Sequence, residues 1–300
     1  MSQNQNYKYF DPAMLAKLQN LKLAAGHIVD GFVAGMHKSR FRGFNVEFSQ
    51  HRQYMQGDEI KNIDWKIFAK TDKYYVKEFE EDTNLKAHIL LDCSSSMMFK
   101  PAGGIFSKFD YACFLVMALS YVILKQQDSA GLITFSDRIL NYVPASSNAS
   151  HFKVLLEELE RAKLNQKTAL SESFNEAASR IKRRSLIIVI SDLYDDENRI
   201  LKSLKHFRHK HHEVAVFHLL SNFELDLAVS GETRFIDLEN SSQIITNAEA
   251  LREDYKAAFN KFIADFKANC LGSYIDYNLI TIDTPIDRAL NNYLVKRARS

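Results

Sequence analysis

The sequence predicts an α/β protein with a doubly wound, mainly parallel sheet, preceded by an α+β extension that packs on it. After residue 84, short apolar segments alternate with amphipathic helical segments. These apolar segments are hydrophobic without alternation, which is typical of parallel strands covered by helices on both faces. Hydrophobic residues make up 46% of the chain, enough for a large core, and ten glycines and four prolines are too few for a long flexible linker. We therefore expect two domains in close contact, residues 1–83 and residues 84–300.

Apolar runs and helical spacing indicate the elements of the larger domain. The expected strands are 87–91, 130–135, 139–143, 186–190 and 214–220. Apolar residues recur at helical spacing within 109–124, 152–159, 170–181, 200–207, 251–266 and 286–294. Segment 109–124 is apolar nearly all round, as expected for a helix buried against a sheet.

Residues 1–83 form a block of different composition, rich in aromatic and charged residues. Segments 44–48 and 75–79 resemble strands, and Ile60, Ile63 and Ile67 recur at helical spacing. The block carries too many aromatic residues for a disordered tail. We expect strands and a short helix here, packed against the larger domain.

Composition and charge exclude several classes of protein. Lys and Arg total 39 against 37 Asp and Glu, so the net charge of +2 argues against a nucleic-acid binder. Cys93, Cys113 and Cys270 are too scattered for a disulfide framework or a zinc site. The longest uncharged apolar stretch, 111–124, is shorter than the roughly 18–20 residues of a membrane span. Because the polar N-terminus also lacks an apolar signal segment, we expect a cytoplasmic protein.

Oxygen-bearing side chains follow two of the predicted strands. Asp92, Ser94 and Ser96 come directly after the first strand, and Asp192 follows the fourth. Thr168 precedes the helix of 170–181. Ligands of open α/β sheets bind at the carboxyl ends of the strands, and hard cations such as Mg²⁺ prefer oxygen ligands. We therefore expect these five residues to form a divalent-metal site.

These motifs are familiar from known families. The spacing Asp92-x-Ser94-x-Ser96, with Thr168 and Asp192 later, resembles the metal-ion-dependent adhesion site of von Willebrand factor A domains. The upstream motifs resemble those of the bacterial "domain of unknown function 58" family: Arg52-x-Tyr54-x-x-Gly57-Asp58, Ile63-Asp64-Trp65, Tyr75-Val76-Lys77 and Phe79-Glu80-Glu81.

The resemblance implies a function as well as a fold. It implies a non-enzymatic module that binds a partner carboxylate through Mg²⁺, or through Mn²⁺ or Ca²⁺ in its place. It also implies a MoxR-type AAA+ ATPase as the partner, with this chain as adaptor or co-chaperone. Gln166 and Lys167 stand where the family usually has glycines before Thr168, so a scaffold with a vacant metal site is an alternative.

Other interpretations of the same residues stay open at this stage. A Mg²⁺-dependent phosphoester hydrolase with Asp92 as nucleophile is the enzymatic alternative, although the expected second acid is replaced by Ser94. The loop hydroxyls alternatively cap the following helix, and Asp195 and Asp196 are typical helix-start acids. The tract His206, His209, His211 and His212 is interpreted as a solvated helix end rather than a zinc site.

The block before residue 84 also has two interpretations. Arg52, Asp58, Asp64 and Trp65 either form a partner-binding surface or an internal network of Arg and carboxylates with Trp65 packed beside it. We favour the internal network.

Overall fold

The computed structural model describes residues 46–56, 58, 63–81, 85–148, 150–164, 169–239 and 241–298. The chain divides into two units, of which the smaller spans Asp30–Asn84 and the larger includes Leu85–Ser300. Each unit is described by itself, and the expected packing of residues 1–83 on the rest stays a prediction.

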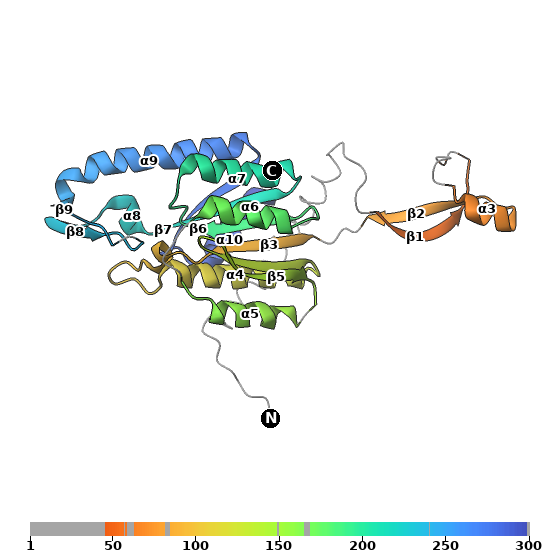
Figure 1. The fold of residues 1–300 in the computed structure, drawn as a ribbon, viewed down its shortest axis with the longest axis horizontal. Helices are drawn as coiled ribbons and strands as arrows, with labels where there is room; N and C mark the ends of the chain where they lie inside the picture. Colours follow the sequence, from red (N-terminus) through yellow and green to blue (C-terminus); the bar gives the residue numbers. More distant parts are fainter. Residues whose placement is uncertain are drawn as a thin grey trace, which may run out of the picture. The chain divides into compact units, whose positions relative to one another are not determined.

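A six-stranded sheet forms the centre of the larger unit (Figure 1). Its strands are β3 (Lys86–Asp92), β4 (Ser129–Phe135), β5 (Ile139–Ser146), β6 (Leu186–Ser191), β7 (Glu213–Leu220) and β10 (Ile275–Thr281). They lie in the order β10-β7-β6-β3-β4-β5, and every neighbouring pair is parallel except β4 and β5. The predicted α/β class with a mainly parallel sheet is thus confirmed.

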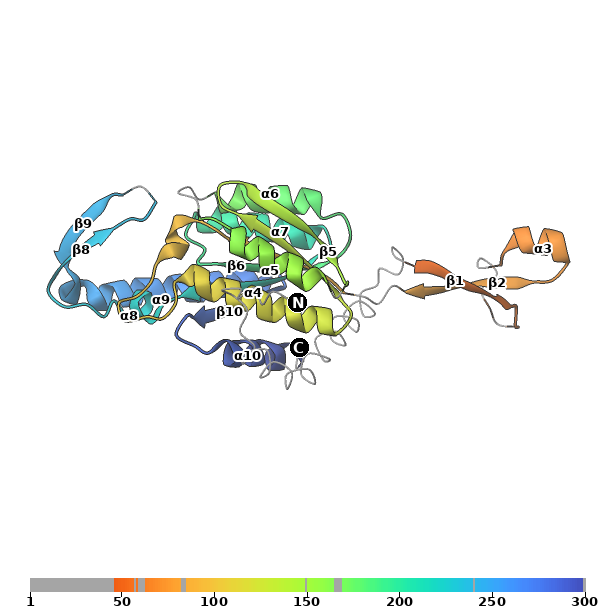
Figure 2. The ribbon, with the colours of Figure 1, turned by 90° about the horizontal axis from the view of Figure 1, so that it is seen from below.

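Helices cover both faces of this sheet (Figures 1 and 2). On one face lie α4 (Lys108–Lys125) and α10 (Ile286–Ala298), with α5 (His151–Arg161) packed against α4. On the other lie α6 (Leu170–Arg180), α7 (Glu197–His209) and α9 (Ala248–Gly272). The helix α4 is buried on nearly all sides, which explains why its sequence is apolar all round.

The core on the α6 and α7 face is built from large apolar side chains. Leu90, Val189 and Val216 of the central strands are fully buried there with Phe174 and Phe207 of the helices. The rings of Phe174 and Phe207 have centroids 6.4 Å apart. Burial of each such side chain stabilises the fold by roughly 1.5–3 kcal/mol.

Besides the 3₁₀ turn Ser95–Met98, four described strands and helices of the larger unit were not predicted. One is β10, whose apolar residues are interrupted by Asp276 and Asn278 because it is an edge strand with partly exposed positions. The others are the hairpin of β8 (Glu232–Ile236) with β9 (Gln243–Asn247), and the five-residue helix α8 (Asn222–Asp226). These segments are too short for a periodic signal.

The order of the strands creates a topological switch point between β3 and β6. From β3 the chain passes through α4 to β4 on one side, whereas from β6 it passes through α7 to β7 on the other. Adjacent parallel strands whose connections diverge leave a crevice at their carboxyl ends. Asp92 ends β3, and Ser191 ends β6, so both lie at this crevice.

The smaller unit contains the antiparallel strands β1 (Val46–Gln53) and β2 (Tyr75–Glu81) and the short helix α3 (Trp65–Thr71). Two predicted boundaries differ from the structure. Ile63 forms an isolated bridge with Val76 rather than a helical turn, and α3 begins only at Trp65. Residues 44, 45 and 60, on which those predictions also depended, lie outside the described residues.

Candidate functional site

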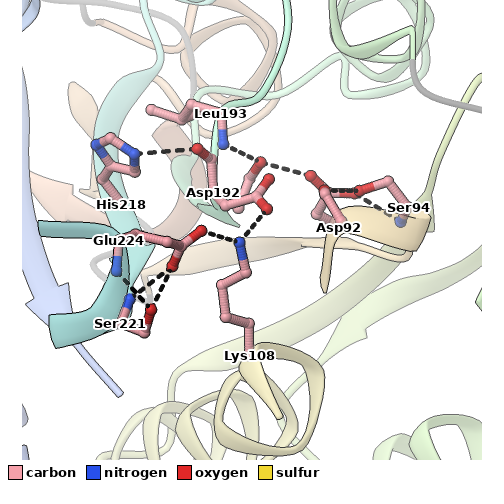
Figure 3. Close-up of polar contacts among 10 residues, drawn as sticks. Asp92, Ser94, Lys108, Asp192, Leu193, His218, Ser221 and Glu224 are labelled. Carbon is pink, nitrogen blue, oxygen red and sulfur yellow. Dashed lines mark hydrogen bonds and ion pairs between the residues drawn. The ribbon is translucent and has the colours of Figure 1, made fainter. Parts of the chain in front are cut away.

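Asp92, the last residue of β3, is completely buried. One carboxylate oxygen, Oδ1, accepts a hydrogen bond from the amide of Ser94 at 2.9 Å. The other, Oδ2, accepts one from the hydroxyl of Ser191 at 2.5 Å. That hydroxyl in turn accepts from the amide of Leu193 at 2.8 Å (Figure 3). The ends of β3 and β6 are therefore joined through this carboxylate.

Ser94 and Ser96 bring their hydroxyl groups together. Their Oγ atoms lie 3.0 Å apart, Ser94 is buried, and Ser96 is partly exposed. Ser94 precedes the 3₁₀ turn Ser95–Met98, but its side chain makes no capping hydrogen bond there. The alternative that this hydroxyl serves as a helix cap is therefore wrong.

Asp192 is held by a lysine from a distant part of the chain. Nζ of Lys108, at the start of α4, donates to Oδ2 of Asp192 at 2.6 Å and to Oε1 of Glu224 at 2.8 Å (Figure 3). Only 3% of the Lys108 side chain is exposed. Oδ1 of Asp192 is buried and has no hydrogen-bond partner among the described residues.

The charges of this cluster do not balance. Asp92, Asp192 and Glu224 supply three carboxylates, and Lys108 supplies one ammonium group. Asp92 forms no ion pair with any described residue. If all four groups are ionised, the cluster has a net charge of −2, although Asp92, Asp192 and Lys108 are buried. Burial of uncompensated charge is costly, so the cluster favours a dication or a proton.

The pKa values follow from this arrangement. Burial, and then the charge of Asp192, raise the pKa of Asp92 to about 7. The pKa of Lys108 is also raised, because attraction to Asp192 and Glu224 outweighs the burial that alone would lower it. Burial lowers the pKa of His218 to about 4. His218 lies with Nε2 3.0 Å from the carbonyl oxygen of Asp192 and supports the backbone of that residue.

Thr168 and Lys167 lie outside the described residues, so neither can be placed in the site. Their neighbours on the chain are held at the same edge of the sheet. The amide of Ala169 donates to the carbonyl of Ser136, just after β4, at 3.4 Å, and the amide of Leu170 donates to Oδ2 of Asp195 at 3.0 Å.

The two helix-start acids behave as predicted. Asp196 caps α7 through the amide of Arg199 at 2.9 Å, and Asp195 holds the first residue of α6. The Asp195 carboxylate thus binds the start of α6.

The residues present fit a hard divalent cation. Two hydroxyl oxygens 3.0 Å apart match the separation of adjacent ligands around Mg²⁺, whose bonds of about 2.0–2.1 Å place neighbouring oxygens roughly 2.9–3.0 Å apart. Asp92 supplies a carboxylate, and Oδ1 of Asp192 supplies an acceptor to which no described residue donates a hydrogen bond. In the described part of the chain, no three His, Cys, Asp or Glu side chains group as a metal site. A metal here would therefore depend on the hydroxyls.

Sequence reasoning missed Lys108, Glu224 and His218. A signal for Lys108 was present, because a lysine in the first turn of a helix opposes the helix dipole and needs a compensating acid. It is also the first residue of an apolar helix, where burial of its side chain is expected. Glu224 carried the signal of a capping box with Ser221, whose amide and hydroxyl each donate to Oε2 at 2.8 Å.

The histidine tract and Cys93 do not form a further site among the described residues. His206 contacts Asn175, with Nδ1 3.0 Å from Oδ1, whereas His212 is buried and accepts from the amide of Ser185 at 3.2 Å. The histidine tract thus does not converge on one point. Cys93 is buried, and burial raises the pKa of its thiol, so it is not a reactive nucleophile.

The interpretation of the upstream block is half right. Arg52 pairs with Asp58 at 2.9 Å, as expected of an internal network. Asp64 caps α3 through the amide of Lys66 at 2.9 Å. Trp65, however, is 55% exposed, so its expected packing beside the network is wrong. Ile67 and Phe68, which follow it on α3, are half-buried.

Comparison with known proteins places the chain among bacterial relatives. It is 24% identical over 261 residues to the uncharacterized protein Rv1480 of Mycobacterium tuberculosis, covering 85% of this chain and 80% of that one. It is 24% identical over 147 residues to the uncharacterized protein YeaD of Bacillus subtilis, covering 48% of this chain and 34% of that one. Within the described residues, no helix has both the length and the apolar character to cross a bilayer.

Solved structures with some likeness include two proteins from Bacteroides species and one VWA domain. An aerotolerance-related membrane protein from Bacteroides fragilis has a TM-score of 0.47 at 18% identity, covering 72% of this chain and 99% of that one. The conserved hypothetical protein BatB from Bacteroides thetaiotaomicron has a TM-score of 0.45 at 19% identity, covering 72% and 100%. The SpRpn10 VWA domain has a TM-score of 0.37 at 13% identity, covering 69% and 95%.

A family model matches most of the chain. The match covers residues 50–262 and so includes α3 of the smaller unit as well as Asp92, Lys108 and Asp192. This extent shows that the chain belongs to the family described as "protein of unknown function DUF58".

Proposed function

We propose that the chain is a non-enzymatic protein-interaction module that binds a carboxylate of its partner through a divalent cation. Asp92, Ser94 and Ser96 would hold the ion, with Thr168 and Asp192 completing the site directly or through water. The ion would be Mg²⁺, with Mn²⁺ or Ca²⁺ as substitutes. The observation that carries the proposal is the cluster of three carboxylates with one ammonium group, in which Asp92 and Asp192 are buried, beside two hydroxyls 3.0 Å apart.

The chemistry of the ligands explains why a partner acid would bind. Hydroxyl ligands carry no charge, and one carboxylate oxygen of Asp192 is already paired with Lys108. A dication held in this way keeps electrophilic character, so a carboxylate from outside gains both a coordination bond and charge neutralisation. Metal and partner would then bind as one linked event, each tightening the other by the same factor.

Family resemblance suggests the partner. We propose a MoxR-type AAA+ ATPase, for which this chain would act as adaptor or co-chaperone. The hydrolase alternative is weakened because the second acid expected two residues after Asp92 is replaced by Ser94.

Lys108 supports one competing function, a scaffold that needs no metal. Its ammonium group already neutralises Asp192 and Glu224 in part, so the loops of the site have one cation without any bound ion. In that case partner binding would not depend on divalent metal at all.

A titration with Mn²⁺, followed by the electron paramagnetic resonance signal of the free ion, tests the proposal. We expect saturable binding that is lost in Asp92→Asn and weakened in Ser94→Ala. The exposed α9 variant Asp265→Asn is the matched control and should bind like the unaltered chain. Acetate, as a minimal carboxylate, should displace water from the bound Mn²⁺ and lower the proton relaxivity.

The partner is tested by capture of a purified MoxR-type ATPase from the same organism, with Mg²⁺ or with EDTA. We expect capture to need the metal. Absence of Mn²⁺ binding, together with capture that EDTA leaves unchanged, would favour the scaffold and overturn the metal-dependent function.

A further inference from the structure

We propose that the smaller unit carries a second docking surface, which binds an acidic polypeptide segment with an apolar anchor residue. The surface consists of four aromatic side chains, which we call the aromatic row: Tyr54, Tyr74, Phe68 and Trp65. It lies outside the metal site of the larger unit, and its function does not depend on that site.

The rings of the row contact one another in series. The centroids of Tyr54 and Tyr74 lie 6.3 Å apart. Tyr74 stacks on Phe68 with centroids 4.5 Å apart and an interplanar angle of 18°. Phe68 meets Trp65 edge to face, at 6.1 Å and 85°. Aromatic pairs in these geometries stabilise one another by about 0.5–1.5 kcal/mol beyond their buried area.

The backbone below the row is fixed by hydrogen bonds. The amide of Tyr54 donates to the carbonyl of Tyr74 at 3.0 Å, which joins two members of the row. Asp64 caps α3 and also lies 3.0 Å from Nε2 of His51 on β1, which attaches the helix to the strand. A platform that is ordered before binding loses little conformational entropy when a partner arrives.

Despite this order, large apolar area stays exposed. Trp65 is 55% exposed, Tyr74 is 47% exposed, and the neighbouring Met55 is 64% exposed. Trp, Tyr and Met are the residue types enriched at protein interfaces, and Trp and Tyr supply many of the strongest contacts. A group of such residues on a small unit indicates a surface that receives another polypeptide.

Charge around the row selects the kind of partner. Lys66 and Lys70 lie one turn apart on α3, and Lys73 follows the helix directly. All three are exposed, and none forms an ion pair with another described residue. Ammonium groups beside an apolar platform complement carboxylates that flank an apolar anchor.

The charge of the whole segment disfavours a nucleic acid. Residues 46–84 contain six Lys and Arg against nine Asp and Glu, a net charge of −3. The segment as a whole is therefore acidic, whereas Lys66, Lys70 and Lys73 are grouped on and just after α3. The basic character is thus local and suits a compact partner segment.

Trp65 is the only tryptophan of the chain, so its emission reports on this surface alone. The probe is the peptide acetyl-Glu-Glu-Leu-Phe-Glu-Glu-amide, added to the full chain in EDTA so that no metal is present. We expect saturable binding with a blue shift of the Trp65 emission. The same peptide with lysines in place of the glutamates should produce no shift.

Charge reversal on the helix provides the matched test. Lys66→Glu combined with Lys70→Glu should weaken binding by roughly tenfold or more, since each lost pair and each new repulsion contributes up to about 1 kcal/mol. Lys202→Glu combined with Lys205→Glu, at exposed positions of α7, should leave it unchanged. Asp92→Asn should also leave it unchanged, which separates this inference from the metal site.

Several results would overturn the proposal. One is the absence of peptide binding, and another is tighter binding of a thymidine oligonucleotide or of phosphatidylserine vesicles than of the peptide. A third is Trp65 emission that is already that of a buried indole in the full chain and does not respond to the peptide, because the row would then be covered by another part of the protein.

Discussion

The ammonium group of Lys108 lies 2.8 Å from Oε1 of Glu224, which joins the first turn of α4 to the first turn of α8. The same ammonium lies 2.6 Å from Oδ2 of Asp192, so one lysine binds both the loop after β6 and the capping glutamate of α8. Loss of this one charge should therefore affect stability and metal binding together.

Replacement of Lys108 by Met should destabilise the fold by about 3–5 kcal/mol, because it leaves Asp192 and Glu224 close together without their cation. Divalent metal should then restore part of the loss, since the cluster becomes more negative. Urea unfolding with and without Mn²⁺ measures both effects. Lys125→Met, at the other end of α4, is the control and should cost less than about 1 kcal/mol, because Lys125 is exposed and its ammonium lies 5.4 Å from the centroid of the Tyr121 ring. Equal behaviour of the two variants would contradict the assigned role of Lys108.

Asp92→Ala should destabilise the protein as well as remove metal binding. Asp92 is fully buried at the end of β3 and accepts hydrogen bonds from Ser94 and Ser191. Loss of the acceptor leaves two buried donors unpaired, at about 1–3 kcal/mol each. Asp92→Asn keeps the shape and should lose less stability while still losing metal affinity. Thermal unfolding separates the two variants, and equal Tm values would show that the buried donors find other partners.

The stability contributed by His88 and His212 should fall as the pH is lowered from neutral, because burial lowers the pKa values of both histidines to about 4. Their folded pKa lies below the ordinary value of 6.5, so the unfolded chain binds more protons between these limits. At about pH 5 each histidine should cost about 1–2 kcal/mol relative to about pH 7.5. Urea unfolding at both pH values should show a smaller difference in His88→Gln, whereas exposed His209→Gln should match the unaltered chain. An unchanged difference in His88→Gln would contradict this assignment.

Two glycine substitutions should have opposite effects on stability. A Cβ atom at Gly131 would lie 2.8 Å from the amide nitrogen of Ala145 and 2.9 Å from the carbonyl oxygen of Val143, both backbone atoms of the paired strand β5. Gly131→Ala should therefore cost about 1–3 kcal/mol. At Gly272, in the last turn of α9, a Cβ atom meets nothing within 4 Å, so Gly272→Ala should add about 0.5–1 kcal/mol. Thermal unfolding of the two variants measures these effects, and Tm shifts of the same sign in both would contradict the prediction.

The central strands were predictable because a strand that is buried on both faces consists of a continuous run of apolar residues. Segments 87–91 and 186–190 were expected and are found as β3 (Lys86–Asp92) and β6 (Leu186–Ser191). An edge strand such as β10 has no such run, since Asp276 and Asn278 occupy partly exposed positions between its apolar residues.

The residues of the site that directly follow a strand could be predicted from the sequence. Asp92, Ser94, Ser96 and Asp192 follow strands whose carboxyl ends must meet at the switch point. Lys108 is different, because its contact with Asp192 spans 84 positions and depends on how α4 packs under the sheet. Local patterns carry no information about such a contact.

The hydrogen bond between Asp92 and Ser191 joins residues 99 positions apart. During synthesis at about 5–20 residues per second, the ribosome needs about 5–20 s to add the residues between them. Throughout that time β3 lacks β6, its neighbour on one side, and Asp92 lacks the hydroxyl that it accepts from in the finished fold. The site thus assembles only after the second half of the sheet has left the ribosome, so a nascent chain stalled before Ser191 would expose an apolar central strand that chaperones must protect.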